Sequence, residues 1–256
     1  MRILITNDDG INAPGIKALE DELSSVGDII TVAPRYEMSS TGHGISLLKE
    51  LLLEECGENR YAVNGYPADC TLLALEAFYK DSFPDLVVSG INNGANLGQD
   101  RYYSGTVAAA REAALHGIPS VAVSLALNYS DEDQKHFLSA AKLIKAFIES
   151  GCSRKIAHHT LANINVPNLP IEKLSGAKLT EVGKRIYIPE LKKRICDKGN
   201  IYYFIGGNYR GDEIIEGSDC EAVSENFVSL SCLDVMNREE GHRDIYDEMI
   251  ELWSWD

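Results

Sequence analysis

The chain has 256 residues, 45% of them hydrophobic and 25% charged, which is typical of a folded globular protein and not of a disordered one. Its net charge of −15 argues against a DNA- or RNA-binding surface, which would have to be basic. It has no run of about 18 apolar residues, so we expect no membrane-spanning helix. The N-terminus meets acid at Asp8, too early for a secretory signal, and the six cysteines are scattered without CxxC spacing. These features predict a cytoplasmic protein with reduced thiols and no zinc.

Strand-like and helix-like stretches alternate along roughly the first 165 residues. We expect strands at Arg2–Thr6, Asp28–Ala33, 45–54, 60–63, Asp85–Ser89, Ser120–Leu125 and Leu161–Val166. We expect helices at Pro14–Val26, Pro67–Tyr79, Thr106–His116 and 131–150. Strands that alternate with helices form right-handed crossovers and a mostly parallel sheet. The predicted fold class is therefore α/β, with a Rossmann-like sheet and flanking helices.

The pattern changes from Leu174 onward to shorter β-like pieces without a clear crossover helix. No linker or repeat is visible, so we expect a single domain over residues 1–256. Its core would be 1–166, followed by a β-rich segment at 167–236 that serves oligomerisation and a tail at 237–256.

Four polar loops follow the predicted strands, at residues 7–10, 39–43, 89–96 and 103–106. In open parallel sheets, ligands bind outside the carboxyl ends of the strands, where such loops meet. We therefore expect the functional site at this edge.

The first of these loops carries two adjacent carboxylates, Asp8 and Asp9. Two like charges about 4 Å apart repel by roughly 4 kcal/mol at an effective dielectric constant near 20, and a bound cation converts this repulsion into binding. Oxygen ligands from Asp, Asn and Ser suit Mg²⁺ or Mn²⁺. The alternative is an ordinary Asp-Asp-Gly turn that precedes a helix.

The sequence Ser104-Gly105-Thr106 opens a strongly helix-forming stretch. Its free N–H groups and the helix dipole favour an anion such as phosphate, although Ser or Thr here can equally be a plain N-cap. The chain has neither a GxxxxGK[ST] loop nor a GxGxxG turn after the first strand, which argues against P-loop and dinucleotide chemistry. His43, in the second polar loop, is either a proton donor to a leaving group or a histidine that hydrogen-bonds its neighbours.

Taken together, these loops resemble the SurE family of survival-protein nucleotidases. The matching stretches are RILITNDDGINAPGI, STGHGISL, VNGYPADC and DLVVSGINNGANLGQDRYYSGTVAAAREAALHGIPSVAVS, with weaker matches to about residue 235. The resemblance implies a metal-dependent phosphomonoesterase, a 5′-nucleotidase that hydrolyses nucleoside monophosphates, with 3′-nucleotide and short polyphosphate hydrolysis as further activities. It also implies one divalent ion, Mg²⁺ or Mn²⁺, and a homodimer or homotetramer, with no DNA or membrane partner.

The resemblance also assigns roles to individual residues. It places the metal ligands at Asp8, Asp9, Ser39 and Asn92, with Asp8 and Asp9 catalytic, and the phosphate-binding residues at Asn96, Ser104, Gly105 and Thr106. The chain departs from the family pattern at Arg35-Tyr36 and at Tyr66, which affects the substrate preference and not the metal ligands. Two other functions use the same residues: a non-catalytic nucleotide or phosphate sensor, and a transferase that binds a metal-bound diphosphate.

Two charged segments lie outside these motifs. Lys184–Lys198 holds six basic residues against two acids, which indicates a solvated hairpin, a surface that steers anionic substrates, or a contact with another subunit. The tail at 237–256 is acidic, but Ile245, Met249, Leu252 and Trp253 fall on one helical face. We therefore expect a short docked helix from about Arg243 to Trp253.

Overall fold

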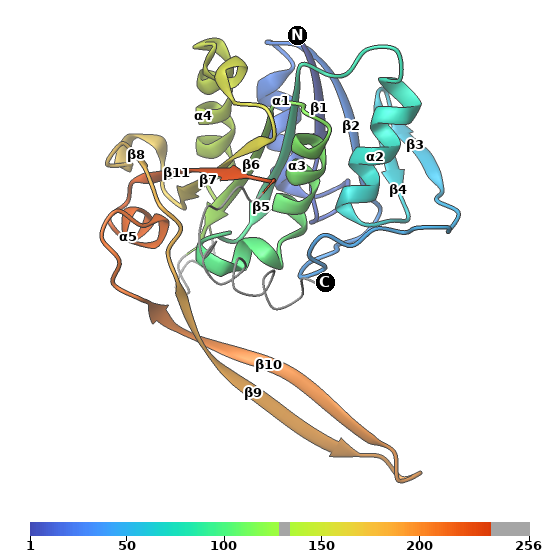
Figure 1. Ribbon diagram of the computed structural model, residues 1–256, viewed down its shortest axis with the longest axis vertical. Coiled ribbons are helices and arrows are strands. Elements are labelled where there is room, and N and C mark those ends of the chain that lie inside the picture. Colours follow the sequence, from blue (N-terminus) through green and yellow to red (C-terminus); the bar gives the residue numbers. More distant parts are fainter. Residues whose placement is uncertain (128–133, 237–256) are drawn as a thin grey trace, which may run out of the picture.

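The computed structural model describes residues 1–127 and 134–236. The predicted tail helix lies outside the described residues. A nine-stranded sheet in the order β3-β4-β2-β1-β5-β6-β7-β11-β8 forms the centre of the molecule, and helices cover both of its faces (Figure 1). This confirms the predicted α/β fold class. No described helix has the length and apolar character that crossing a membrane requires.

The central strands are parallel and almost wholly buried. They are β1 (Arg2–Thr6), β2 (Asp28–Pro34), β4 (Arg60–Val63), β5 (Leu86–Asn93), β6 (Ser120–Ala126) and β7 (Thr160–Pro167). Their branched apolar side chains alternate between two cores, one on each face, which explains why these strands read as continuous hydrophobic runs.

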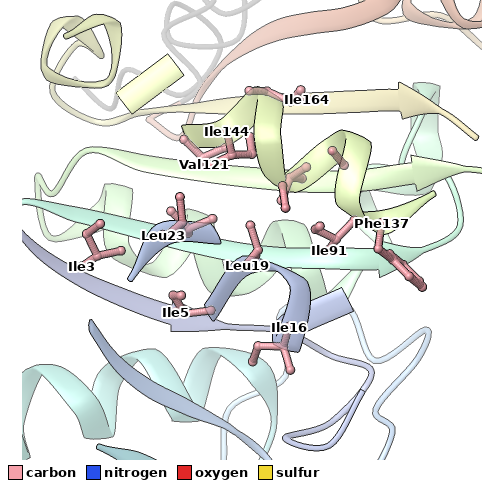
Figure 2. Close-up of a cluster of buried hydrophobic side chains, with 14 of the residues drawn as sticks. Ile3, Ile5, Ile16, Leu19, Leu23, Ile91, Val121, Phe137, Ile144 and Ile164 are labelled. Atoms are coloured by element: carbon pink, nitrogen blue, oxygen red, sulfur yellow. The ribbon is translucent and has the colours of Figure 1, made fainter. Parts of the chain in front are cut away.

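Two helices pack on each face of the sheet. Helices α1 (Pro14–Leu23) and α4 (Phe137–Glu149) cover one face, where Ile16, Leu19 and Leu23 of α1 lie over Ile3 and Ile5 of β1 (Figure 2). The other face is covered by α2 (Pro67–Phe78) and α3 (Gly105–Leu115). Side chains spaced three and four residues apart on each helix fill the core, as the sequence periodicity predicts.

The structure corrects two of the sequence predictions. Residues 45–52 form no strand: β3 begins only at Leu53 and ends at Gly57, antiparallel to β4. Leu47 and Leu48, which made this stretch look like a strand, are exposed, and Leu48 has a positive φ of 59°. No neighbouring strand pairs with this stretch before Leu53, which lies opposite Val63 of β4.

The region after β7 also differs from the expected short β pieces. The strands β8 (Ala177–Leu179) and β11 (Val228–Asp234) extend the central sheet beyond β7, and a short helix, α5 (Asp219–Ser224), precedes β11. Between β8 and α5 in the chain, β9 (Arg185–Ile195) and β10 (Ile201–Asp212) form a long antiparallel hairpin that projects from the body of the molecule (Figure 1). We call this hairpin the arm.

The base of the arm is fixed to the short 3₁₀ helix η1 (Gly98–Tyr102). Arg185 forms an ion pair with Asp100 at 2.7 Å, and the Tyr187 hydroxyl donates to the same carboxylate. The side chain of Gln99 exchanges two hydrogen bonds with the backbone of Arg185. The arm also contains the basic segment Lys184–Lys198, which spans strand β9 and the start of the turn that follows it.

Candidate active site

The strand order places a topological switch point between β1 and β5. From β1 the chain moves outward through β2 to β4, then returns to β5 on the other side of β1. At such a point the loops that follow the two strands diverge and leave a crevice at the carboxyl edge of the sheet. The loops after β1, β2 and β5 all open into this crevice, where the sequence predicted the site.

The loop after β1 is held in a tight turn by Asn7. The Asn7 amide donates to the carbonyl oxygen of Gly10 at 2.9 Å, and its Oδ1 accepts from the Gly10 N–H at 3.1 Å. Gly10 has a φ of +101°, which a residue with a side chain rarely adopts. The turn brings Asp8 and Asp9 side by side at the edge of the sheet.

The Asp8 carboxylate is buried and receives one side-chain hydrogen bond. Its Oδ1 accepts from the Thr106 hydroxyl, in the first turn of α3. Burial raises the pKa of Asp8 above its usual range, although hydrogen bonds from Thr106 oppose the shift. The sequence did not reveal that the predicted phosphate-binding Thr106 contacts the predicted metal ligand Asp8.

Asp9 is partly exposed and lies next to this buried charge. Its Oδ2 accepts from the Asn93 N–H at 3.0 Å. Burial, together with repulsion from Asp8, raises the pKa of Asp9 to about 6. Across the part of the chain that the structure describes, no Lys, Arg or His nitrogen lies within 4.0 Å of either carboxylate. Lys135 lowers the pKa of Asp9 from a greater distance, but its effect is smaller than those of burial and Asp8.

The carboxylate pair opens into a cavity of about 600 Å³. Six of the eight predicted site residues line it: Asp8, Asp9, Ser39, Asn92, Asn96 and Ser104. The other two, Gly105 and Thr106, lie directly behind Asp8. Glu37, Tyr103 and Tyr187 also line the cavity, and sequence reasoning did not single them out.

Ser39 and Asn92 supply oxygen atoms beside the two carboxylates. The Ser39 hydroxyl donates to Glu37 Oε1 at 2.7 Å. The Asn92 amide nitrogen donates to the carbonyl oxygen of Gly94 at 2.8 Å, so its side-chain oxygen is the atom that could bind a cation. No group of three His, Cys, Asp or Glu side chains suitable for a metal occurs among the described residues. The donor set here, two carboxylates with a hydroxyl and an amide, is the kind that a hard divalent cation takes.

Asn96 is held by a buried polar network. Its N–H donates to Asn165 Oδ1 at 2.8 Å, and its side-chain amide donates to Ser124 Oγ at 2.8 Å. Its carbonyl oxygen accepts from the amides of Asn163 and Asn165. These two asparagines were missed, although two amides at alternate positions of a buried strand are a recognisable signal. The hydrogen bond to Ser124 holds the Asn96 side-chain amide in one orientation, and this also fixes where its second N–H points.

The turn before α3 is an N-cap, one of the two alternatives that the sequence left open. Ser104 Oγ accepts from the Val107 N–H at 3.0 Å. The N–H groups at the start of α3 remain without helical partners, as at every helix N-terminus. The cap and the predicted anion site are therefore compatible, and the phosphate-binding role remains a prediction.

His43 does not line the cavity. Its Nε2 lies 2.7 Å from Glu112 Oε2, on the second turn of α3. Of the two alternatives for His43, the structure favours the histidine that hydrogen-bonds to its neighbours.

The residues that depart from the family pattern lie beside the site. Arg35 forms an ion pair with Glu54. The ring of Tyr66 packs against Gly44, where an added Cβ would lie 3.2 Å from it. Both contacts shape the segment between β2 and β3 and leave the carboxylate pair untouched.

The comparisons with known proteins agree with the motifs and the fold. The family model "Survival protein SurE" matches residues 3–189. The chain is 41% identical to a 5′-nucleotidase SurE of Geobacter sulfurreducens, over all of this chain and 94% of that protein. It is 40% identical to a 5′-nucleotidase SurE of Vibrio parahaemolyticus, over 92% of this chain and 89% of that one. The crystal structure of the Sure protein from Aquifex aeolicus superimposes with a TM-score of 0.84 at 34% identity, covering 99% of this chain and all of that one. The chain therefore belongs to the SurE family.

Proposed function

We propose that this protein is a metal-dependent phosphomonoesterase, a 5′-nucleotidase that hydrolyses nucleoside monophosphates to nucleoside and inorganic phosphate. The observation that carries the proposal is the pair Asp8 and Asp9, two adjacent carboxylates at a cavity, which form no ion pair with any of the described residues. The names of the curated relatives, 5′-nucleotidases with about 40% identity over most of the chain, support the same activity.

Asp8, Asp9, Ser39 and Asn92 would hold one divalent cation, Mg²⁺ or Mn²⁺. All four line the same cavity and all four offer oxygen atoms. A divalent ion in such a site supplies positive charge for phosphoryl oxygens and lowers the pKa of a bound water. The high pKa of Asp9 supports this assignment, because two neighbouring carboxylates without a cation are electrostatically unfavourable.

Asn96, Ser104 and the N–H groups of Gly105 and Thr106 would bind the phosphate. The start of α3, an eleven-residue helix, provides the positive end of a helix dipole, and the N–H groups of Gly105 and Thr106 also stabilise the neighbouring Asp8 carboxylate. The Thr106 hydroxyl keeps Asp8 in a fixed orientation beside this turn.

The cavity volume of about 600 Å³ is that of a small-molecule site and leaves room for the nucleoside. Tyr103 and Tyr187 supply aromatic surface along its wall. Hydrolysis of 3′-nucleotides and of short polyphosphate belongs to the same proposal.

The decisive experiment measures inorganic phosphate released from a panel of nucleoside monophosphates, with chelator and after Mg²⁺ or Mn²⁺ is restored. We expect release that the chelator abolishes and the metal restores. Nucleotide binding without release would instead support the sensor, and transfer to a second substrate would support the transferase.

The Thr106 hydroxyl gives a first test of the site. Thr106→Val keeps the shape of the side chain but leaves the buried Asp8 carboxylate without its side-chain donor. A charge-assisted hydrogen bond is worth about 1.5–3 kcal/mol, so kcat/KM for phosphate release should fall by roughly 10- to 100-fold. Thr106→Ser keeps the donor and should stay within about 3-fold of wild type.

A matched control for Thr106 is Thr71→Val. Thr71 is also buried at the contact between α2 and α3, but its hydroxyl donates to the backbone oxygen of Ala109. Thr71→Val should lower the melting temperature without a specific loss of kcat/KM. Similar losses of activity in both Val variants would contradict the role of Thr106 at Asp8.

The arm supports the proposal that the protein is a homodimer or homotetramer. Beyond Pro189 it exposes large apolar side chains on both of its faces: Leu191, Ile195, Ile201, Tyr202, Tyr203, Phe204 and Ile205. Exposed apolar surface of this extent is typical of a protein interface. Replacing residues 190–206 by a two-residue Asn-Gly turn keeps Arg185 and Tyr187 in place. We expect this variant to sediment as a smaller species than wild type at the same concentration.

The same variant tests electrostatic steering. Of the basic residues in Lys184–Lys198, Lys184, Arg185 and Lys192 already pair with Glu213, Asp100 and Glu190. If Lys193, Arg194 and Lys198 steer anionic substrates, kcat/KM falls with added salt in wild type and less in the shortened variant. An unchanged sedimentation coefficient with identical salt profiles would leave only the solvated hairpin.

A further inference from the structure

The Glu112 carboxylate lies between two histidines on the side of α3 that faces the segment after β2. Its Oε2 lies 2.7 Å from His43 Nε2, and its Oε1 lies 3.3 Å from His116 Nε2. Burial raises the pKa of Glu112, but the hydrogen bonds and charges of the two histidines outweigh burial and hold this pKa below its usual value. An ionised carboxylate only accepts hydrogen bonds, so Nε2 of His43 is the donor.

The two histidines reach Glu112 from different parts of the chain. His116 follows one turn later at the end of α3, and its side chain is 39% exposed. His43 belongs to residues 35–52, which connect β2 to β3 without helix or strand. The bond from His116 is therefore local to one helix end, whereas the bond from His43 joins two segments 69 residues apart.

The segment that contains His43 also carries Ser39, a proposed metal ligand. Its backbone is attached by Met38 N–H to the oxygen of Asp8 at 2.7 Å and by Gly42 N–H to the oxygen of Tyr103 at 2.9 Å. Among the described residues, His43 is the only member of 36–44 whose side chain hydrogen-bonds to a helix. The side chains of Ser39 and Thr41 bond only within the segment.

We propose that His43 is a positioning residue, which ties the Ser39 segment to α3 through Glu112 and so holds Ser39 in register with the carboxylate pair. This inference rests on the proposed phosphatase function. The first turn of α3 contacts Asp8 through Thr106, and its second turn holds His43 through Glu112. One helix thus fixes both Asp8 and the segment that carries Ser39. Without the tether, Ser39 would occupy its place in the site for only a fraction of the time, and the apparent affinity for metal and substrate would fall by that fraction.

The test compares two amides at position 43. His43→Gln places an N–H₂ near the position of Nε2 and keeps the donor to Glu112, whereas His43→Asn is too short to reach it. For His43→Asn we expect the KM and the metal concentration for half activation to rise at least about 10-fold, with kcat at saturation within about 3-fold of wild type. His43→Gln should restore both constants to within about 3-fold of wild type. Equal losses in both variants, mainly in kcat and with an altered pH profile, would make His43 a proton donor and overturn the proposal.

His116→Gln is the matched control, since it alters the other partner of the same carboxylate and leaves the Ser39 segment attached. We expect its constants to stay near those of wild type. If His43→Asn is unstable, Glu112→Ala provides the second variant. It should have the same kinetic defect, because it removes the acceptor of the His43 bond. A Glu112→Ala protein with wild-type KM and metal requirement would overturn the proposal.

Amide hydrogen exchange tests the tether without activity. In metal-free protein, peptides that cover 36–44 should exchange faster in His43→Asn and Glu112→Ala than in wild type, His43→Gln or His116→Gln, with peptides of β1 and β5 unchanged. Equal exchange of 36–44 in all five proteins would overturn the proposal. If wild type releases no phosphate from any nucleotide, the proposed function fails, while the exchange experiment still decides whether His43 holds the segment.

Discussion

Replacing Asp9 by Asn is expected to reduce kcat/KM for phosphate release by about a thousandfold or more while the protein stays folded. Asp9 is half of a carboxylate pair that forms no ion pair within the described residues, and burial and repulsion from Asp8 raise its pKa to about 6. In the proposed site this change removes a charged metal ligand. Metal assistance is worth several kcal/mol, and each tenfold in rate corresponds to about 1.4 kcal/mol. Phosphate release at saturating metal measures the effect, and Asp8→Asn should behave in the same way.

Stability should change in the opposite direction to activity. In metal-free protein the two carboxylates repel each other, so Asp9→Asn should keep or slightly raise the melting temperature. Asp28→Asn is a matched control, because Asp28 is exposed at the start of β2, at the opposite edge of the sheet. It should leave both quantities unchanged. Near-normal turnover in Asp9→Asn would contradict the metal assignment, and a collapse of its melting temperature would mean that Asp9 serves the fold.

The buried parallel strands were the most predictable part of the fold. Arg2–Thr6 was predicted with the bounds that β1 has, and the helix predicted at Pro14–Val26 differs from α1 only at its end. These elements follow local rules, since a strand buried on both faces must be apolar throughout and a helix on one face must repeat every three to four residues. Residues 45–52 were also predicted as part of a strand, but they include Lys49 and Glu50, and pairing with β4 begins only at Leu53.

The C-terminal elements depend on partners that are distant in sequence. Strand β11 pairs with β7 on one side and β8 on the other, although residues 168–227 separate it from β7. In the arm, Pro189 pairs with Gly207 and interrupts the apolar pattern in the middle of both strands, so the hairpin read as several short pieces. The hydrophobic periodicity of a segment does not indicate which distant strand it pairs with.

The site was predictable in its composition and not in its contacts. Polar loops at the strand ends pointed to Asp8, Asp9 and Ser104, because the topology brings the ends of parallel strands together. The resemblance to the SurE family added Ser39 and Asn92. The bond from Thr106 to Asp8 joins residues 98 apart. That contact gives Thr106 a role beside a carboxylate, where the sequence indicated only a helix cap or an anion site.

Any side chain at Gly105 is expected to disrupt the site, and Gly105→Val should reduce kcat/KM at least about 100-fold. An added Cβ would lie 2.7 Å from Asp8 Cβ, 2.9 Å from Asp8 Oδ2 and 2.8 Å from Pro67 Cγ. None of these atoms belongs to a long flexible side chain, because Asp8 lies in the tight turn after β1 and Pro67 begins α2. Either α3 moves outward and takes Thr106 from Asp8, or Asp8 moves. Overpacking of this kind costs about 1–3 kcal/mol, so the melting temperature should fall as well.

The comparison of two alanine variants separates an effect on the site from an effect on stability. Gly105→Ala already introduces the crowded Cβ, whereas at Gly57 in β3 the nearest atom to an added Cβ is Arg60 Cδ at 3.7 Å, an ordinary contact. Gly57→Ala should keep full activity. If 104–106 served only as an N-cap, Gly105→Ala would lower the melting temperature while its folded fraction kept wild-type kcat/KM. Loss of kcat/KM well below the unfolding temperature, together with slower metal-dependent activation, would instead follow from displacement of Asp8 by the new Cβ.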